Sequence, residues 1–438
     1  MGPRTLLLPL ALAACGSAAI IRRDPTPGFL SRPITHAKRN TVLHTRDESI
    51  TIYNETSVTY LFEIAIGTPP QNVYVVLDSG SFELWVDPTC STASTSSQAA
   101  DCQGAGLYDP SNSSTAQDME ATNELPYGKG TVDIAYVADS IQLPGTDAKT
   151  LSQVIFGVGQ GSQDLAFGIA GVGHGRGYNL QYNNLIDELY EQNVTNSKAF
   201  SVALGSKDAT NGGTVVFGGI DTGKFTGNLT RFDNLPPQTE QGMEGMVRYW
   251  IQLDGIAIKG KKYDGSSLPV VLDTGATMSY LPQSVISGLA KDFKADVQSD
   301  GTLVVDCKYL KDSGTVDFTF GTLTIKVPYH EFVWEAAPNV CVVAAAPVSG
   351  TTPILGDSFL RSAYVVFDQS NADIYLAQYK NCGTNEQILP AGQGVAGNFT
   401  GECQEAKGES GAVARGVGGN VVAWVGVGMV LQTLFFAL

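Results

Sequence analysis

The sequence predicts an all-β protein made of two related lobes, and three observations support this. Between about Tyr53 and Gln378 most apolar segments are short, rich in β-branched and aromatic residues, and separated by Gly, Asn, Asp or Pro. The stretch VVLDSGSFELWV at 75–86 has a counterpart, VVLDTGATMSYLP, at 270–282. Only two segments show helical spacing of apolar residues. The internal repeat therefore indicates two similar β lobes, joined near residues 240–248.

The expected elements follow from their composition. The clearest strands are TYLFEIAIG (59–67), TVVFGGI (214–220), YWIQLDGIAI (249–258), TLVVD (302–306), VDFTFGTLTIKV (316–327) and SAYVVFD (362–368). The segment 178–193 predicts a helix with Leu185, Ile186 and Leu189 on one face. A second helix is expected over 282–297, starting at Pro282, because proline suits the first turn.

The N-terminal end has the features of processing signals. Residues 1–19 contain Arg4, an apolar run and small residues at the end, which is typical of a secretory signal peptide. A buried N-terminal helix is the alternative. Residues 20–39 are basic and end in Lys38-Arg39, which indicates a prosegment closed by a dibasic processing site. The predicted lobes then span 40–245 and 246–380.

The C-terminal end predicts a lipid anchor. Residues 421–438 are apolar to the last position and have no basic stretch behind them. Three small residues, Ser410, Gly411 and Ala412, precede a short spacer, as a GPI-attachment signal requires. We therefore expect attachment at Ser410 and removal of 411–438, with 381–410 serving as a linker or stalk. A retained tail anchor is the alternative.

Composition narrows the functional class further. The 438 residues are 43% hydrophobic and 16% charged, which indicates a globular protein, and the formal charge of −16 argues against nucleic acid and suits an acidic medium. Cys15 would leave with the signal peptide. Six cysteines remain for an oxidising compartment: Cys90, Cys102, Cys307, Cys341, Cys382 and Cys403. Of the 15 possible connectivities, we expect sequential pairing. Five N-glycosylation sequons are present, at Asn54, Asn112, Asn193, Asn228 and Asn398.

The repeated motif places a carboxylate at the end of an apolar run in each half. Asp78-Ser79-Gly80 and Asp273-Thr274-Gly275 are each ordinary turn sequences when taken alone. A buried ionised carboxylate is costly unless it is hydrogen-bonded or used in chemistry. Each motif is followed at a distance by an apolar-apolar-glycine triplet, at 169–171 and 354–356. This order in both halves favours a functional pair.

The ordered set of two Asp-Ser/Thr-Gly motifs, Trp85, Tyr127-Gly128 and the two triplets resembles the pepsin-like aspartic proteases over residues 55–380. The prosegment and anchor signal resemble the fungal GPI-anchored yapsin branch. The resemblance implies a bilobal pepsin-like fold with two β-barrel-like lobes and an active-site cleft between them. It also implies that each triplet strand packs behind the opposite aspartate loop.

The resemblance assigns roles to residues as well. The implied catalytic pair is Asp78 and Asp273. Support for this pair would come from Ser79, Gly80, Ser81, Thr274 and Gly275. Ser79 and Thr274 would hydrogen-bond across the axis between the lobes. The flap and substrate cleft would include Tyr127, Gly128, Trp85 and Thr277.

Two adjacent carboxyl groups suit peptide hydrolysis because they cannot both ionise easily. They share one proton and so supply a base for water and an acid for the carbonyl oxygen. We expect no metal, cofactor or covalent intermediate. The implied function is a secreted aspartic endopeptidase that binds extended polypeptides, acts as a monomer and is held at the cell surface by its GPI anchor.

Two departures from the family pattern and several alternatives stay open. Ala276 stands where the family usually has Ser or Thr donating to the aspartate, which predicts a less acidic titration of the pair. Lys129 at the flap tip is either a solvated turn residue or a cation that disfavours basic substrates. The main alternative function is a catalytically silent surface protein for binding or adhesion. His174 and His330 lack the context of a serine triad, and the glycine-rich segments 157–161 and 171–177 lack that of a dinucleotide site.

Overall fold

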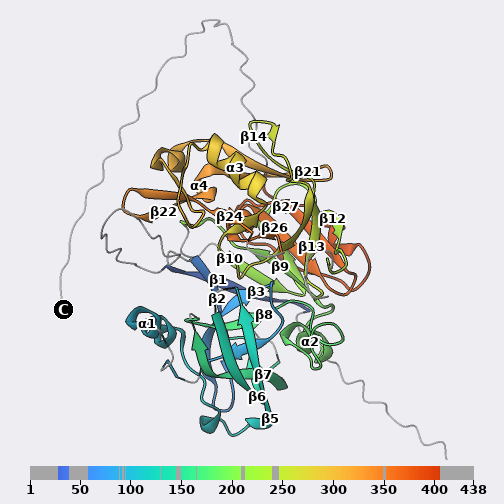
Figure 1. Cartoon of the computed structure of the whole chain (residues 1–438). Coiled ribbons are helices and arrows are strands. Elements are labelled where there is room, and N and C mark those ends of the chain that lie inside the picture. The colour runs from blue at the N-terminus through green and yellow to red at the C-terminus, as the bar shows by residue number, and fades with distance from the viewer. Residues whose placement is uncertain are drawn as a thin grey trace, which may run out of the picture. The chain divides into compact units, whose positions relative to one another are not determined.

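The structure is a computed structural model of the chain (Figure 1). It describes residues 28–38, 58–87, 89–90, 93, 95–128, 130–144, 149–163, 165–208, 213–238, 246–348 and 352–404. The chain divides into two units after Gln404. The second unit, Glu405–Leu438, lies outside the described residues, so the fold below is that of the first unit.

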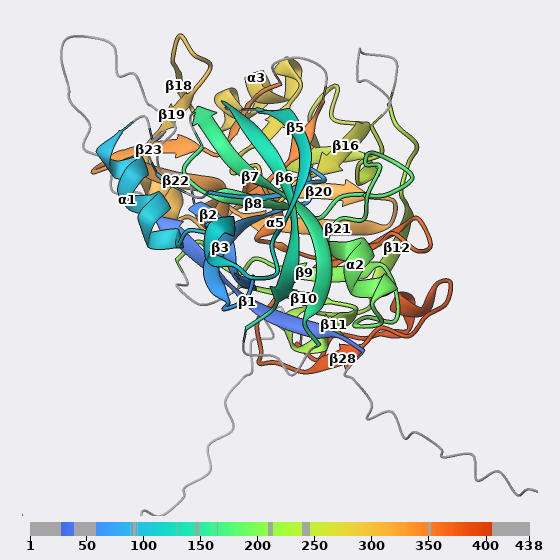
Figure 2. The same cartoon turned by 90° about the horizontal axis from the view of Figure 1, so that it is seen from below.

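The largest sheet in the described part of the chain has 13 strands in the order β12-β27-β26-β9-β10-β1-β2-β3-β8-β4-β7-β6-β5. In chain order its strands are β1 (Leu30–Lys38), β2 (Val58–Ile66), β3 (Gln71–Asp78), β4 (Leu84–Val86), β5 (Gln117–Tyr127), β6 (Gly130–Gln142), β7 (Leu151–Gln163), β8 (Gly168–Gly171), β9 (Ala199–Ala203), β10 (Gly213–Phe217), β12 (Thr230–Asp233), β26 (Ala363–Asp368) and β27 (Asp373–Gln378). Figure 2 shows the long strands β5 and β6 of the first half side by side.

The second half contributes most of the smaller sheets. The five-stranded sheet contains β13 (Trp250–Leu253), β16 (Leu268–Leu272), β25 (Ile354–Leu355), β17 (Ser279–Leu281) and β24 (Ala345–Pro347). One four-stranded sheet contains β15 (Lys261–Lys262), β14 (Gly255–Ile258), β20 (Thr315–Phe320) and β21 (Leu323–Pro328), and the other contains β18 (Asp296–Val297), β19 (Leu303–Val305), β23 (Val340–Val343) and β22 (Val333–Ala337). A two-stranded sheet pairs β11 (Gly219–Asp221) with β28 (Glu386–Ile388).

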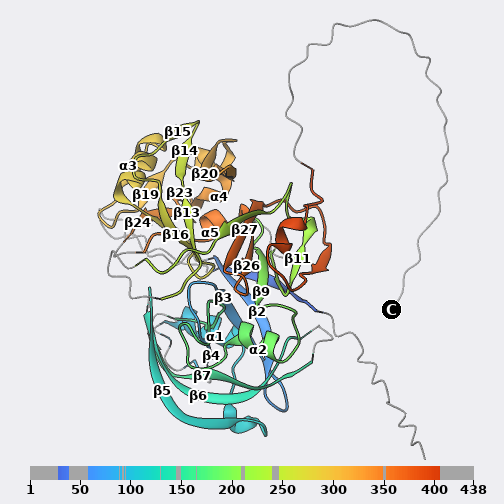
Figure 3. The same cartoon turned by 90° about the vertical axis from the view of Figure 1, so that its right-hand side faces the viewer.

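Helices are few and short among the described residues. They are α1 (Ser96–Ala105), α2 (Leu185–Glu191), α3 (Gln283–Asp292), α4 (Tyr329–Phe332) and α5 (Asp357–Leu360), with 3-10 turns η1 (Pro110–Asn112), η2 (Thr222–Lys224), η3 (Cys307–Lys311) and η4 (Val395–Asn398). Figure 3 shows α3 beside the strands of the second half and α2 among those of the first. The predicted all-β class is therefore confirmed.

The strands follow two sequence patterns. In some strands apolar residues alternate with polar ones, and in others every residue is buried because both faces of the strand are covered. In β20 the buried residues Val316, Phe318 and Phe320 alternate with half-buried ones, which is the period of a strand with one apolar face. In contrast, β26 is buried at every position, as expected of a strand covered on both faces.

The internal repeat is also a structural repeat. In the first half β3, which ends at Asp78, runs parallel to β8, and in the second half β16, which leads to Asp273, runs parallel to β25. The expectation that each triplet packs behind the opposite aspartate loop is therefore wrong. Each triplet strand is hydrogen-bonded directly to the aspartate strand of its own half, β8 to β3 and β25 to β16, and therefore lies beside that strand. Val172 N–H, for example, donates to Asp78 C=O at 2.8 Å.

The two halves share the 13-stranded sheet. Strands β26 and β27 come from the second half, yet β26 pairs with β9 and β27 pairs with β12. Aromatic residues from both halves pack here, and the Phe200 and Phe367 rings stack with centroids 4.8 Å apart. Tyr249 packs against Phe367 at 4.3 Å. A continuous core thus fixes the relative position of the two aspartate loops.

Residues 30–38, which belong to the predicted prosegment, form β1 inside this sheet. The strand pairs with β10 through Leu30–Ile34 and with β2 through Thr35–Lys38. Leu30 and Ile34 are buried. This part of the predicted prosegment is therefore an internal strand of the sheet.

The two expected helices are present but shorter than their apolar patterns. The first begins at Leu185 because Asn184 and Asp187 form a capping box, in which each side chain accepts from the other's backbone N–H. The second spans Gln283–Asp292 and buries Val285, Ile286 and Leu289. Helix α1 was not expected, because SSQAADCQGA has no apolar periodicity; Thr95 caps its N-terminus.

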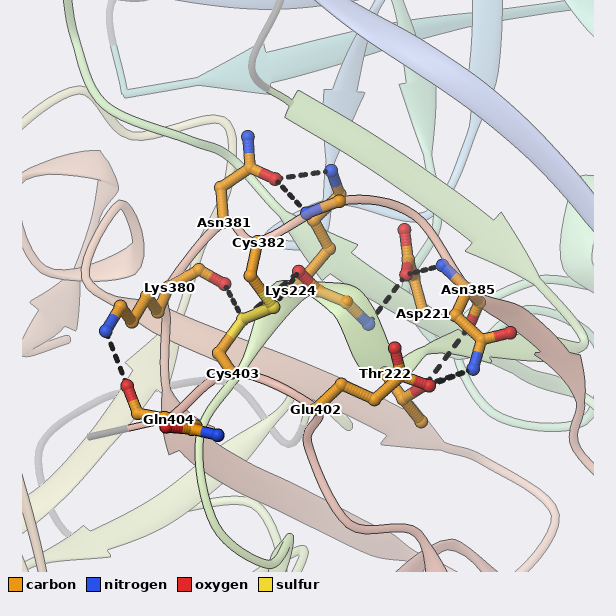
Figure 4. Close-up of a disulfide and its surroundings, with 12 residues drawn as sticks. Asp221, Thr222, Lys224, Lys380, Asn381, Cys382, Asn385, Glu402, Cys403 and Gln404 are labelled. Carbon is orange, nitrogen blue, oxygen red and sulfur yellow. Dashed lines mark hydrogen bonds between the residues drawn. A yellow bond between two sulfur atoms is a disulfide. The ribbon is translucent and has the colours of Figure 1, made fainter. Parts of the chain in front are cut away.

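The segment 381–404 differs from the expected linker, because it is folded onto the body. Strand β28 pairs with β11, and Leu389 and Ala396 are buried in a cluster with Ile220 and Phe225. Asn385 N–H donates to Asp221 Oδ1 at 2.8 Å (Figure 4). The described part of the predicted stalk is thus a strap that completes the fold.

The six cysteines form disulfides in sequential order. The pairs are Cys90–Cys102, Cys307–Cys341 and Cys382–Cys403. The first joins α1 to the segment before it, and the second joins η3 to β23. Figure 4 shows the third, which closes the strap next to Lys380. Such cross-links stabilise a fold mainly by restricting the unfolded chain.

Candidate active site

The two predicted aspartates lie together, each at the end of a buried strand. Asp78 is the last residue of β3 and Asp273 follows β16. Both are almost fully buried, with 6% and 9% of their surface exposed. Each carboxylate accepts a hydrogen bond from the glycine two residues on: Gly80 N–H to Asp78 Oδ1 and Gly275 N–H to Asp273 Oδ1, both at 2.8 Å.

Ser79 and Thr274 link the two loops symmetrically. Ser79 N–H donates to Thr274 Oγ1 at 3.0 Å, and Thr274 N–H donates to Ser79 Oγ at 2.9 Å. Each hydroxyl then donates to a backbone carbonyl of the other half, Ser79 to Leu272 at 2.9 Å and Thr274 to Leu77 at 2.7 Å. These four buried hydrogen bonds hold the aspartate loops in one arrangement.

The glycines allow the carboxyl groups to approach the opposite loop. A Cβ atom on Gly80 would lie 2.4 Å from Asp273 Oδ2, and one on Gly275 would lie 2.5 Å from Asp78 Oδ1. Both separations are too short for any side chain. Each carboxyl group therefore touches the backbone of the opposite loop, so that the two groups are neighbours.

Proximity and burial shift the titration of the pair. Burial is the main cause that raises the pKa of Asp273, and the charge of Asp78 raises it further. The hydrogen bond from Gly275 N–H and the charge of Arg248 oppose this rise. One carboxyl group of the pair is thus held in its neutral form over a pH range where an isolated aspartate is ionised.

The hairpin of β5 and β6 places Tyr127 near the aspartates. Trp85 Nε1–H donates to the Tyr127 hydroxyl at 2.9 Å, and the two rings lie 6.5 Å apart. Burial raises the pKa of Tyr127, and the charge of Asp78 adds to this rise. Gly128 is exposed at the hairpin end, and Lys129 lies outside the described residues. The hairpin is therefore anchored to the aspartate lobe through Trp85.

The two loops differ after the glycine. Ser81 Oγ donates to Asp78 Oδ2 at 2.5 Å, whereas Ala276 at the matching position has no hydroxyl group. Ala276 C=O accepts from Asp357 N–H at 2.8 Å, so its backbone is held in place. Thr277 lies half-buried in the following loop. The Asp78 carboxylate thus accepts a side-chain hydrogen bond from its own loop that Asp273 lacks.

Sequence reasoning missed two charged groups beside the pair. The Arg248 guanidinium donates to Gly80 C=O at 2.7 Å and lies 5.7 Å from the Phe82 ring centre. Asp357 is fully buried after the second triplet, and burial raises its pKa well above the usual range. Asp357 follows the Ile-Leu-Gly triplet directly, a position that could have signalled it. Arg248 approaches Gly80 only through the folding of distant segments.

The remaining predicted residues lie away from this site. Four sequon asparagines are exposed on the described surface: Asn112, Asn193, Asn228 and Asn398. The predictions for 1–19, Asn54, Ser410 and 411–438 fall outside the described residues. Among the described helices, none is long and apolar enough to cross a membrane. In the same part of the chain, no group of three or more His, Cys, Asp or Glu side chains is arranged to hold a metal ion.

Comparison with known proteins identifies the family to which this chain belongs. The family described as eukaryotic aspartyl protease matches residues 59–379, and the chain belongs to that family. It is 31% identical over 400 residues to the probable aspartic-type endopeptidase opsB of Aspergillus fumigatus, with 86% of this chain and 79% of the relative covered.

Two other fungal aspartic proteases are similar to this chain over most of its length. The chain is 32% identical to the aspartic proteinase yapsin-3 of Saccharomyces cerevisiae over 84% of this chain and 76% of yapsin-3. It is 30% identical to candidapepsin-1 of Candida albicans, with 86% and 96% covered. The crystal structure of an aspartic proteinase from Irpex lacteus matches 81% of this chain and 98% of that one, with a TM-score of 0.61 at 19% identity. That likeness shows the pepsin-like fold, and the family shows an aspartic-type endopeptidase.

Proposed function

We propose that this protein hydrolyses peptide bonds with a water molecule activated by Asp78 and Asp273, which share one proton. The observation that supports this most strongly is the mutual contact of the two loops, in which each glycine touches the opposite carboxyl group. The ionised carboxyl group of the pair takes a proton from water. The protonated one donates to the carbonyl oxygen of the substrate.

The reaction balances without a covalent intermediate. The water oxygen bonds to the carbonyl carbon, which gives a tetrahedral species with two hydroxyl groups. Its C–N bond then breaks as the nitrogen takes a proton from one carboxyl group of the pair, and a hydroxyl group of the tetrahedral species returns a proton to the other carboxyl group, so the pair again holds one proton. The hydrogen bonds of Ser79 and Thr274 keep the carboxyl groups in position during these transfers. Tyr127, held by Trp85, covers the substrate from the hairpin of β5 and β6.

We also propose that the protein follows the secretory route and is held at the cell surface by a GPI anchor attached at Ser410. The sequence signals at the two ends support this, together with three disulfides and four exposed sequons. Release of the protein from cells by a phosphatidylinositol-specific phospholipase would support the anchor. Retention after that treatment, with residues 411–438 still present by mass spectrometry, would contradict it.

The alternative is a catalytically silent binding or adhesion protein with the same fold. A statine-type inhibitor discriminates between the two, because it mimics the tetrahedral species and binds tightly only to a working pair. We expect the purified protein to cleave a mixed peptide library at acidic pH and to lose this activity on stoichiometric titration with the inhibitor. A protein that binds peptides but neither cleaves them nor responds to the inhibitor would refute the enzymatic function.

A further inference from the structure

Arg248, which lies near the two aspartates, has no acidic partner within the described part of the chain. Its side chain is half-buried, and none of the ion pairs between described residues includes it. Nη1–H donates to Gly80 C=O at 2.7 Å, and Nη2 lies 3.5 Å from Met246 Sδ, a weak acceptor. A guanidinium carries several N–H donors in a planar fork, so these contacts leave most of its donors for another group.

The contact with Gly80 places this guanidinium beside the catalytic pair. Gly80 follows Asp78 by two positions, and a Cβ atom on Gly80 would lie 2.4 Å from Asp273 Oδ2. Burial raises the pKa of Asp273, and Arg248 is close enough for its charge to oppose that rise. A peptide that binds at the pair therefore lies within reach of the Arg248 side chain.

The backbone around Arg248 is held in one position. The Asn179 side chain donates to Val247 C=O at 2.9 Å and accepts from Val247 N–H at 3.1 Å. Asn179 also donates to His174 C=O at 2.9 Å. On the other side, Trp250 N–H donates to Arg248 C=O at 3.0 Å. Because the backbone that carries the guanidinium is already ordered, a ligand loses less free energy to ordering it.

Apolar side chains flank the cation on the surface. The Phe82 ring centre lies 5.7 Å from the Arg248 guanidinium carbon, in a cation–π contact. Met246 and Tyr178 are 44% and 63% exposed, and they belong to the two segments that Asn179 joins. Exposed apolar residues that gather around a polar group are typical of binding surfaces. We call the set Phe82, Tyr178, Met246 and Arg248 the Arg248 patch.

We propose that the Arg248 patch binds a carboxylate of the peptide substrate, so that Arg248 is a specificity residue of the peptidase. A guanidinium can hold a carboxylate through a pair of parallel N–H···O hydrogen bonds. The apolar parts of the peptide would contact Tyr178 and Met246. The carboxylate is that of an Asp or Glu side chain, or the C-terminal carboxylate of a short peptide. This inference rests on the proposed peptidase function and names a substrate group that it recognises.

The overall charge of the chain acts against such a preference. The formal charge of −16 repels acidic peptides at a distance. A preference for a carboxylate at one position therefore comes from a local contact with a cation and not from the field of the whole protein. Hydrogen bonds between charged groups commonly change binding by roughly ten-fold or more.

The test compares fluorogenic peptides that differ only in Glu or Gln, with this residue moved through four positions on each side of the cleaved bond. The assay is run at about pH 5, where a Glu side chain is largely ionised. A second series of uncharged peptides compares a free C-terminal carboxylate with a C-terminal amide, at increasing distance from the cleaved bond. We expect the wild type to prefer the charged member at one position or one length, with a kcat/KM ratio of roughly ten.

Three variants assign the preference to a residue. Arg248→Gln should bring the ratio near one, and the ratio is used because any change in the catalytic pair itself affects both members of a peptide pair. Arg248→Lys keeps the charge but not the planar fork, and should keep part of the preference. Arg176→Gln is the control, because it makes the same chemical change at an exposed arginine in the loop that contains Tyr178. It should keep the wild-type ratio.

The outcomes separate this inference from the function on which it depends. If the wild type cleaves no peptide of either series, the peptidase function itself fails. If uncharged peptides are cleaved and no charged member is preferred, only the inference on the Arg248 patch fails. A preference that survives Arg248→Gln also overturns it, once circular dichroism and the unfolding midpoint show that the variant is folded. A preference confined to the Glu series identifies a side-chain carboxylate, and one confined to the second series identifies the peptide C-terminus.

Discussion

Replacing Thr274 by Val tests whether the link between the aspartate loops stabilises the two halves. Valine keeps the shape of threonine but removes its hydroxyl, which accepts from Ser79 N–H and donates to Leu77 C=O. Leaving the buried Ser79 N–H unpaired costs about 1–3 kcal/mol, and losing the second hydrogen bond costs about 0.5–1.5 kcal/mol. We therefore expect the free energy of unfolding to fall by about 1.5–4.5 kcal/mol.

The assay is urea unfolding followed by tryptophan fluorescence, with the midpoint and slope compared between variants. Thr322→Val makes the same chemical change in the exposed turn between β20 and β21, and should alter stability by less than about 0.5 kcal/mol. Ser79→Ala removes the symmetrical pair of bonds and should cost a similar amount to Thr274→Val. If Thr274→Val is no more destabilising than Thr322→Val, the link contributes nothing and the reasoning is refuted.

Three further predictions follow from particular contacts. Ala276→Thr gives the second aspartate loop a hydroxyl donor like the one that Ser81 supplies to Asp78 in the first loop. The acid limb of the plot of kcat/KM against pH should therefore move down by about one pH unit. An acid limb that is unchanged or moves up would refute this prediction. Burial lowers the pKa of His174 to about 4, so this side chain stays neutral in the folded protein at pH values where it takes up a proton in the unfolded chain. The free energy of unfolding should therefore fall by roughly 3 kcal/mol as the pH drops from about 6.5 to 4. Denaturation measured at several pH values should show that His174→Gln flattens this dependence. Ile34→Ala should destabilise the unprocessed chain by about 2–5 kcal/mol, because Ile34 is buried in β1 and β1 lies inside the sheet. A Tm equal to that of the wild type would show that β1 is not part of the folded precursor.

The features that sequence predicted best are those encoded by neighbouring residues. The Asp-Ser/Thr-Gly turns, the apolar strands before them and the triplets are local patterns, and their repetition indicates two lobes. The contacts between lobes are different, because Arg248 and Gly80 are 168 positions apart and meet only through the shared sheet. Glu83 lies within the first aspartate motif, yet the cavity that it lines is formed by β5, β6, β7 and the loop at 179–182, which no sequence spacing brings together.

Other differences have physical causes of the same kind. Helix α1 is fixed by its cap and a disulfide rather than by an apolar face, so its sequence lacks the helical period. The strap at 381–404 is polar and glycine-rich like a stalk, but pairing with β11 and the burial of Leu389 hold it on the body. The order of the triplets in the chain did not reveal which aspartate strand each one joins.

The central claim is that Asp78 and Asp273 act as one pair that shares a proton during peptide hydrolysis. The most direct measurement is kcat/KM for Asp78→Asn and for Asp273→Asn with the same peptide at acidic pH. We predict that each variant loses at least about 10²-fold to 10⁴-fold in activity while unfolding cooperatively as the wild type does. Near wild-type turnover by either folded variant would contradict the claim.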